Sequence, residues 1–162
     1  MAWLAQPFLK EIGINMKSYG IIWALLNIMV GIVAFFAHKI ETQLSELKSL
    51  FIVGIICVLG YIFIANNMNY VGLIILFIFY ANRGYATPLL RNYINRHTES
   101  NVRATVMSIR SFIIRTNFAI IAPFIGWIAD QYGLNSAFLI MALTCLLYTS
   151  PSPRDQRGSR MP

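Results

Sequence analysis

Residues 101–138 read NVRATVMSIRSFIIRTNFAIIAPFIGWIADQYGLNSAF and decide the fold of this chain. Within them, residues 104–127 form an apolar run, and about 20 residues of helix suffice to cross roughly 30 Å of hydrocarbon. Pro123 is expected to bend this helix near its far end, because proline cannot donate to the carbonyl of Ala119. Residues 130–133 then turn the chain into a second apolar run. The stretch therefore predicts a membrane-spanning helix, a turn and the start of another helix.

One face of the predicted helix at 104–127 is small and polar. At 3.6 residues per turn, that face carries Ala104, Ser108, Ser111, Arg115, Ala119, Ala122 and Gly126. Arg110 lies near the basic end and can extend to water, whereas Arg115 lies near mid-helix, where a charge is costly. Two interpretations of Arg115 stay open. Either it faces a water-filled path, where it binds an anionic group or acts as a gate, or backbone carbonyls cap it and it holds helices together.

The rest of the chain is also rich in apolar residues, with 57% hydrophobic and only 12% charged residues overall. About four full spans are predicted, at 18–37, 50–65, 71–90 and 104–127. The stub at 1–9 and the run at 137–148 are too short to cross a bilayer, so we expect truncated helices at both ends. The predicted fold is all-α, a polytopic transmembrane helical bundle embedded in the lipid bilayer of the cell membrane.

The formal net charge of +7 comes largely from basic residues at helix ends, not along one surface. This distribution indicates membrane topology and argues against a nucleic-acid partner. Lys and Arg favour cytoplasmic loops. The loops 38–49 and 91–103 lie on one predicted side and carry Lys39, Lys48, Arg91, Arg96 and Arg103. Since the loops on the other side carry only Lys10 and Lys17, the first side is predicted to be cytoplasmic.

The first span, 18–37, combines small residues with one amide on a single face, which comprises Gly20, Ala24, Asn27, Gly31 and Ala34. Small residues at this spacing let a neighbouring helix approach closely, so the face is expected to pack against another helix. Asn27 is expected to make either an interhelical hydrogen bond or a cavity contact.

In the third span, 71–90, a predicted kink and an intramembrane charge coincide. Pro88 would leave the carbonyl of Gly84 without its helical partner, and Arg83 lies beside that carbonyl. Arg83 therefore has the same two interpretations as Arg115, a functional cation or a helix lock. Tyr80 and Asn82 add polar groups to this part of the span.

Several kinds of chemistry are not predicted. No Asp or Glu lies within the predicted spans, so they offer no carboxylate to carry a proton or bind sodium at mid-membrane. No pair of carboxylates, no His/Cys cluster at metal-ligand spacing and no Gly-rich phosphate loop is present, so an enzyme, a metal site and a cofactor are not expected. Cys57 and Cys145 lie in apolar runs and are expected to act as small hydrophobic residues.

Several motifs together resemble a known family. The segments RGYATPLLRNYIN (83–95), RATVMSIRS (103–111) and PFIGWIADQYGLNSAF (123–138) are similar to the last third of a major facilitator superfamily transporter. The stub QPFLKEIGI and the segment AFFAHKIE resemble the end of that fold's seventh helix and its eighth. The resemblance implies that residues 1–148 are an incomplete carboxyl-terminal transmembrane repeat. Residues 149–162, TSPSPRDQRGSRMP, are interpreted as a non-native or disordered tail.

The resemblance also implies a function, namely secondary active transport of a small solute by alternating access, with a missing amino-terminal half as partner. The helices matching the stub and the third span line the central cavity in that fold, and those matching the first and fourth flank it. The candidate transport-path residues are Arg83, Arg115, Tyr80, Asn27, Asn82 and Gln6, and the candidate kink residues are Pro88, Gly84 and Pro123.

A second interpretation stays open. The small-residue faces of the first and fourth spans would also suit a small structural membrane protein, or a subunit of a membrane complex. The solute is not defined by the sequence, although Tyr80 and Tyr85 beside an intramembrane cation would suit an organic anion or an amphipathic drug.

Overall fold

The structure, a computed structural model, describes residues 3–41 and 46–149. It consists of helices, and no strand occurs in these two ranges. The helices are α1 (Ala5–Glu11), the 3-10 helix η1 (Met16–Ser18), α2 (Tyr19–Glu41), α3 (Glu46–Asn66), α4 (Tyr70–Arg96) and α5 (Arg103–Thr149). The all-α prediction is confirmed. Residues 150–162, which make up nearly all of the predicted tail, lie outside the described ranges.

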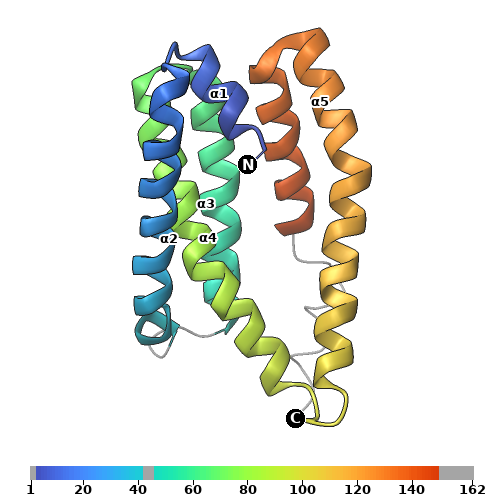
Figure 1. Ribbon diagram of the computed structural model, residues 1–162. Helices are drawn as coiled ribbons and strands as arrows, with labels where there is room; N and C mark the ends of the chain where they lie inside the picture. The colour runs from blue at the N-terminus through green and yellow to red at the C-terminus, as the bar shows by residue number, and fades with distance from the viewer. Residues whose placement is uncertain (1–2, 42–45, 150–162) are drawn as a thin grey trace.

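Helix α5 is two helices joined at a sharp turn. Gly133 has φ 82° and ψ 162°, a conformation that an L side chain rarely adopts and that glycine adopts freely. The turn divides α5 into a first limb, residues 103–132, and a second limb, residues 134–149 (Figure 1). The prediction of a turn at 130–133 is therefore confirmed, with Gly133 as the residue that makes it.

Asparagines lie at the ends of three other helices. The Asn69 side chain accepts a hydrogen bond from the Val71 amide (2.9 Å) and so caps the start of α4. At the end of α3, the amide of Asn66 donates to the Ile62 carbonyl at 2.7 Å. Near the other end of the chain, Asn15 caps η1 by accepting from the Lys17 amide at 3.0 Å.

The spans are longer than their apolar runs. For example, α4 continues to Arg96, well past the predicted end of its apolar run at residue 90. The backbone stays helical as the chain leaves hydrocarbon, because helical hydrogen bonding is equally possible in the polar interface. Among the described residues, four helices are long and apolar enough to cross a membrane by length and composition.

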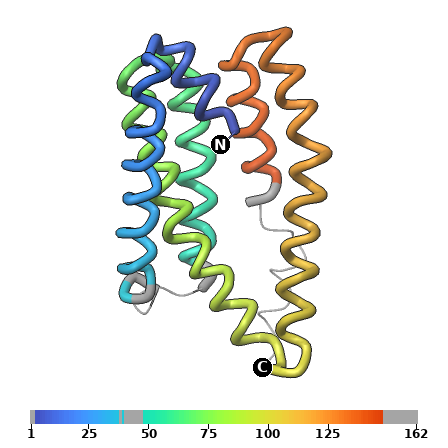
Figure 2. Tube along the Cα trace, in the orientation of Figure 1, coloured from blue at the N-terminus to red at the C-terminus, as the bar shows by residue number. Residues whose placement is uncertain are grey.

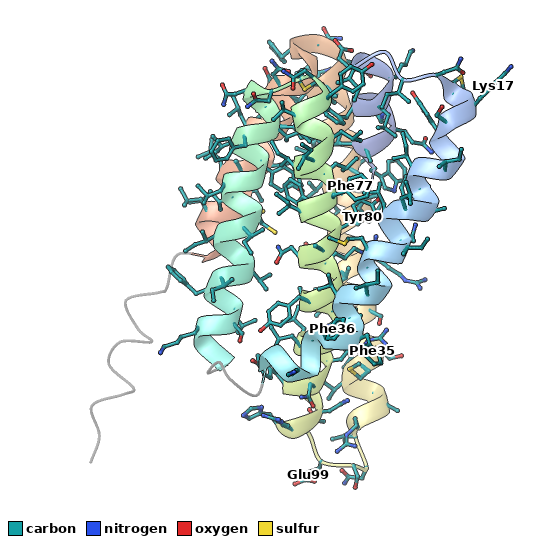
Figure 3. The ribbon with its side chains drawn as sticks, turned by 90° about the vertical axis from the view of Figure 1, so that its left-hand side faces the viewer. Lys17, Phe35, Phe36, Phe77, Tyr80 and Glu99 are labelled. Carbon is teal, nitrogen blue, oxygen red and sulfur yellow. The ribbon has the colours of Figure 1, made fainter. Side chains whose placement is uncertain are left out.

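The helix ends alternate between two ends of the bundle. The 97–102 turn lies at the same end as the finish of α2 and the start of α3, and the turns at 12–15, 67–69 and 133 lie at the opposite end (Figure 1). Lys17 and Glu99 mark these two ends in Figure 3. At the 97–102 end, Arg103 donates to the carbonyls of Asn95 (3.3 Å) and Thr98 (3.4 Å), which ties α4 to α5.

The core forms where α3 packs on α4 and on the second limb of α5, while α2 packs on α4. Aromatic rings hold this centre together. Tyr61 of α3 contacts Phe79 of α4 (4.6 Å between ring centroids) and Phe138 of the second limb (6.3 Å), and Phe8 of α1 meets the same Phe138 at 6.3 Å. The short helix α1 is therefore anchored in the core.

The side chains of the first limb of α5 are far more exposed than those of the second limb. From its start to residue 121 nearly every side chain is exposed, and Ile125 is its one residue in the buried core. It starts beside the end of α4 at the 97–102 turn and diverges from α4 toward the opposite end, where α1 and the second limb lie between them (Figure 2). We call the sides of α4 and of the first limb that face α1 the inner sides.

The predicted packing face of α2 is open among the described residues. A Cβ built on Gly20 or Gly31 would meet no atom within 4 Å, and Ala24 is exposed. Instead, α2 meets α4 through neighbouring positions such as Trp23 and Val30. The expectation that the small-residue face packs against a neighbouring helix is therefore not met within the described part of the chain.

Candidate functional site

Three consecutive residues of α4 point in three directions. The Asn82 amide donates to the Val53 carbonyl (3.1 Å) and to Cys57 Sγ (3.3 Å), both on α3. On the other side, a Cβ built on Gly84 would lie 2.6 Å from the carbonyl oxygen of Val30 on α2. Because successive residues of an α-helix are about 100° apart around the axis, Arg83 points between α3 and α2.

The helical stripe that contains Arg83 identifies this direction as the inner side of α4. Leu76 and Tyr80, two turns and one turn earlier on the same stripe, are 0% and 2% exposed. Both belong to the buried core that includes Phe8 of α1. Arg83 itself is exposed, because it lies one turn beyond the part of α4 that α1 covers.

Tyr80 stands between Arg83 and α2. Its ring meets Trp23 edge to face at 5.9 Å between centroids, and the guanidinium carbon of Arg83 lies 5.9 Å from the same ring. Figure 3 shows Tyr80 near the middle of the bundle. Within the described residues, neither the Tyr80 hydroxyl nor Trp23 Nε1 has a hydrogen-bond partner. An aromatic pair with unpaired polar tips therefore lies next to an intramembrane cation.

The two prolines do not interrupt their helices. Pro88 lies inside α4, which remains helical from Tyr70 to Arg96, and the Thr87 hydroxyl donates to the Arg83 carbonyl at 2.9 Å. Pro123 lies inside the first limb of α5, which continues to the turn at Gly133. Gly84 lies in close contact with α2. Small residues commonly allow membrane helices to approach one another this closely.

The small and polar face of the first limb lies on its inner side. Ala119, Ala122 and Gly126 of that face line a pocket between α1 and α5. Arg115 precedes Ala119 by one helical turn and so continues the same stripe toward the 97–102 end. Arg115 therefore lies on the inner side of the first limb and Arg83 on the inner side of α4, and neither residue lines the pocket.

The pocket has a volume of about 770 Å³. Its walls include Trp3 and Phe118, whose rings meet edge to face at 5.0 Å between centroids. Charged residues also line it, namely Lys10 and Glu11 of α1 and Asp130 of the first limb. Glu11 and Asp130 lie close to the turns at 12–15 and 133, so the acidic groups are at the outer end of the pocket.

The two remaining candidates lie at the margin of this arrangement. Asn27 is exposed on α2 and donates to the carbonyl of Trp23, one turn earlier, at 2.8 Å. It therefore lies near the side of α2 on which Trp23 contacts Tyr80. Gln6 of α1 is exposed and is not among the residues that line the pocket.

Capping groups are absent around both arginines in the described part of the chain. Within residues 3–41 and 46–149, no hydrogen bond or ion pair joins the guanidinium of Arg83 or of Arg115 to another residue. The helix-lock interpretation expected backbone carbonyls around them, and none is found there. The same ranges contain no group of three or more His, Cys, Asp and Glu residues that could hold a metal ion.

Some residues of the site carried no clear signal in the sequence. Trp23 is one turn before Asn27 and on a similar face, so periodicity could have drawn attention to it. Trp3 and Phe118 meet across a long separation in the chain, and no local pattern indicates such a contact. Asn82 was expected on the transport path, and the structure turns its amide toward α3 instead.

Comparison with known proteins identifies the family. A family model, that of the Major Facilitator Superfamily, matches residues 1–151 and thus nearly the whole chain. No curated protein and no solved structure matches the chain. The helical fold with its membrane-spanning helices agrees with this assignment. The chain belongs to the major facilitator superfamily, a family of membrane transporters.

Proposed function

We propose that residues 1–148 form the carboxyl-terminal transmembrane repeat of a secondary active transporter of the cell membrane. In this proposal the transporter moves a small solute by alternating access, in which two repeats rock around a site near the middle of the bilayer. The observation that supports the proposal best is the position of Arg83 and Arg115, two intramembrane cations on the inner sides of α4 and of the first limb. Within the described residues, neither guanidinium has a hydrogen-bond or ion-pair partner.

The energetic argument concerns the arginines. A charge inside the membrane is costly, so such residues almost always face a protein interior or a water-filled cavity. Arg83 and Arg115 would meet this requirement if they lined an aqueous path. Tyr80, Trp23 and Asn27 would then form the neighbouring wall of the path on the α4 and α2 side.

The opposite wall of the path belongs to the proposed amino-terminal repeat. The largely uncovered first limb and the open Gly20 and Gly31 face of α2 are surfaces that this repeat could contact. No acid occurs in the apolar runs of this chain, so an ion-coupling carboxylate, if the transporter uses one at mid-membrane, belongs to the other repeat.

A reconstitution experiment tests the proposal. The chain is inserted into liposomes alone or together with an amino-terminal repeat of the same transporter, and uptake of a panel of labelled solutes is measured. We expect uptake only with both repeats, and we expect Arg83→Gln and Arg115→Gln to reduce it strongly. Uptake by the chain alone, or normal uptake in both variants, would contradict the proposal.

The open face of α2 also supports a second candidate, a structural subunit of a membrane complex. A Cβ built on Gly20 or Gly31 meets nothing, so both positions are available to a partner helix. This candidate predicts that a partner protein copurifies with the chain and is lost on Gly31→Leu, while no solute is taken up in the reconstituted system.

A further inference from the structure

We infer that the pocket between α1 and α5 binds one phospholipid whose head carries a primary ammonium and a phosphate. In this arrangement one acyl chain lies along the apolar walls of the pocket. The head lies at the outer end, beside Lys10, Glu11 and Asp130. This site is additional to the proposed transport path, and neither of the two intramembrane arginines lines it.

The pocket lies beside α1. All of its walls belong to residues 3–11 and to the two limbs of α5, which Figure 1 shows next to α1. On α1 and on the first limb, Trp3 and Phe118 are the wall residues furthest from the turns at 12–15 and 133. Their rings meet at 5.0 Å between centroids, so the two walls are joined at the inner end of the pocket.

The length of the pocket matches one leaflet of a bilayer. Its wall on the first limb includes Phe118 and Asp130, which are about 18 Å apart along a helix that rises about 1.5 Å per residue. One leaflet offers roughly 15 Å of hydrocarbon, half of the ~30 Å core. Because the outer end lies at the turns, the pocket runs from the interface into hydrocarbon, the direction in which acyl chains lie.

Polar and apolar groups are separated along the pocket as they are in a lipid. The charged wall residues, Lys10, Glu11 and Asp130, are all close to the turns, at the outer end. The walls deeper in the pocket are aromatic, aliphatic or small, with Phe118 and Ile121 as examples. The volume of about 770 Å³ falls within the range of sites for small ligands. The pocket therefore suits a single apolar chain with a charged head.

The charges at the outer end indicate which head fits. Two carboxylates and one ammonium line this end, and within the described residues no ion pair joins any of these three side chains to another group. A primary ammonium can donate hydrogen bonds to Glu11 and Asp130, and a phosphate can accept from Lys10. A head with both groups, as in phosphatidylethanolamine, complements all three charges.

Two other common heads fit the outer end less well. Phosphatidylglycerol carries a phosphate and no cation, so Glu11 and Asp130 would repel it without a compensating attraction. Phosphatidylcholine carries a quaternary ammonium, which has no N–H group to donate to a carboxylate. The expected order of affinity is therefore phosphatidylethanolamine, then phosphatidylcholine, then phosphatidylglycerol.

Competition among these three lipids tests the inference. The chain is purified at low ionic strength in mixed micelles that contain the three lipids in equal amounts and with the same acyl chains, and bound lipid is identified by native mass spectrometry. We expect one retained lipid per chain, with phosphatidylethanolamine exceeding each of the others about fivefold, the upper range for exposed ion pairs. Glycerophosphoethanolamine, which has the head without the chains, should not displace it. Equal retention of the three lipids, or displacement by the free head group, would overturn the inference.

Substitutions at the outer end test the contacts of the head. Glu11→Gln and Asp130→Asn should each reduce the preference for phosphatidylethanolamine over phosphatidylcholine about threefold. Lys10→Gln should lower retention of both lipids alike, because both phosphates lose the same partner. Glu99→Gln is the matched control, since Glu99 is also exposed but lies at the opposite end of the bundle (Figure 3), and we expect no change in the preference. A preference unchanged in both pocket variants, or lost equally in Glu99→Gln, would contradict the assignment.

A change in the wall tests the position of the acyl chain. Gly126 lines the pocket, and a Cβ built on it meets no atom within 4 Å, so Gly126→Leu fills part of the pocket without a clash among the described residues. It should strongly reduce lipid retention while the helical circular dichroism stays that of the original chain. Gly31→Leu is the control, because its built Cβ also meets no atom and Gly31 lies on α2, which contributes no wall. Unchanged retention in Gly126→Leu, or an equal loss in Gly31→Leu, would show that the lipid does not occupy the pocket.

Discussion

The close approach of α4 to α2 at Gly84 predicts that a larger residue at position 84 destabilises the fold, and it indicates by how much. A Cβ at position 84 would lie 2.6 Å from the Val30 carbonyl oxygen and 3.1 Å from its Cα, where ordinary contacts are 3.4–4 Å. The obstacle is helix backbone, which cannot rotate away as a side chain can. The Gly84→Ala substitution should therefore push the two helices apart by roughly an ångström and destabilise the fold by about 1–3 kcal/mol, as overpacking does.

Other glycines provide graded controls for Gly84→Ala. At Gly60 the built Cβ meets only the ring of Phe79, at 2.8 Å, and a ring can shift more easily than backbone. At Gly31 the built Cβ meets nothing, and alanine favours helix over glycine by roughly 0.5–1 kcal/mol. We therefore expect the loss of stability to decrease from Gly84→Ala to Gly60→Ala, and Gly31→Ala to be neutral or stabilising.

The assay for this series is unfolding of the purified chain by increasing SDS in mixed micelles. Tryptophan fluorescence reports the transition, since Trp23 contacts Tyr80 close to the α2–α4 crossing. A Gly84→Ala chain as stable as the original, or a Gly31→Ala chain less stable than Gly84→Ala, would refute the packing described for these helices.

Three further outcomes are expected. Asn82→Leu should lower stability in the same SDS titration by about 0.6 kcal/mol, the typical value of an interhelical hydrogen bond, whereas Asn27→Leu removes only a bond within its own helix and should have a smaller effect; the reverse order would contradict the contacts described. In intact cells, a membrane-impermeant thiol reagent should label Lys17→Cys from outside and leave Arg96→Cys unlabelled, since the predicted topology puts position 96 in the cytoplasm; labelling of position 96 alone would invert it. In liposomes with both repeats, Arg83→Lys should retain more uptake than Arg83→Gln, because it keeps the charge; equal loss would show that charge is not what Arg83 contributes.

The positions of the spans could be predicted from the sequence, because the thickness of hydrocarbon fixes how long an apolar run must be. The turn at Gly133 could also be predicted, since a glycine and an acid separate two apolar runs there. The helix ends could not be placed well, as α4 shows by continuing to Arg96. Nothing in an apolar pattern marks where a helix stops once it has left the bilayer.

The neighbours of each helix were the harder part to predict. Helical periodicity identifies which residues share a face, but lipid and protein satisfy an apolar or small-residue face equally well. For this reason the face of α2 around Gly31 was expected to pack against another helix, whereas it is open in the described chain. For the same reason Asn82 was expected on the transport path, whereas its amide donates a hydrogen bond to α3. The stripe that carries Arg115 was identified from periodicity, and its relation to the pocket required the structure.

The central claim is that the inner sides of α4 and the first limb face a water-accessible path, and thiol accessibility tests it most directly. In a chain with Cys57→Ala and Cys145→Ala, single cysteines are placed at Arg115 and, as a control, at Ile113, which is exposed on the opposite face of the same limb. The chain is held in a lipid bilayer and treated with a charged methanethiosulfonate reagent. We expect rapid modification of Arg115→Cys and protection of Ile113→Cys, which faces acyl chains. Protection of Arg115→Cys, or faster modification of Ile113→Cys, would contradict the account.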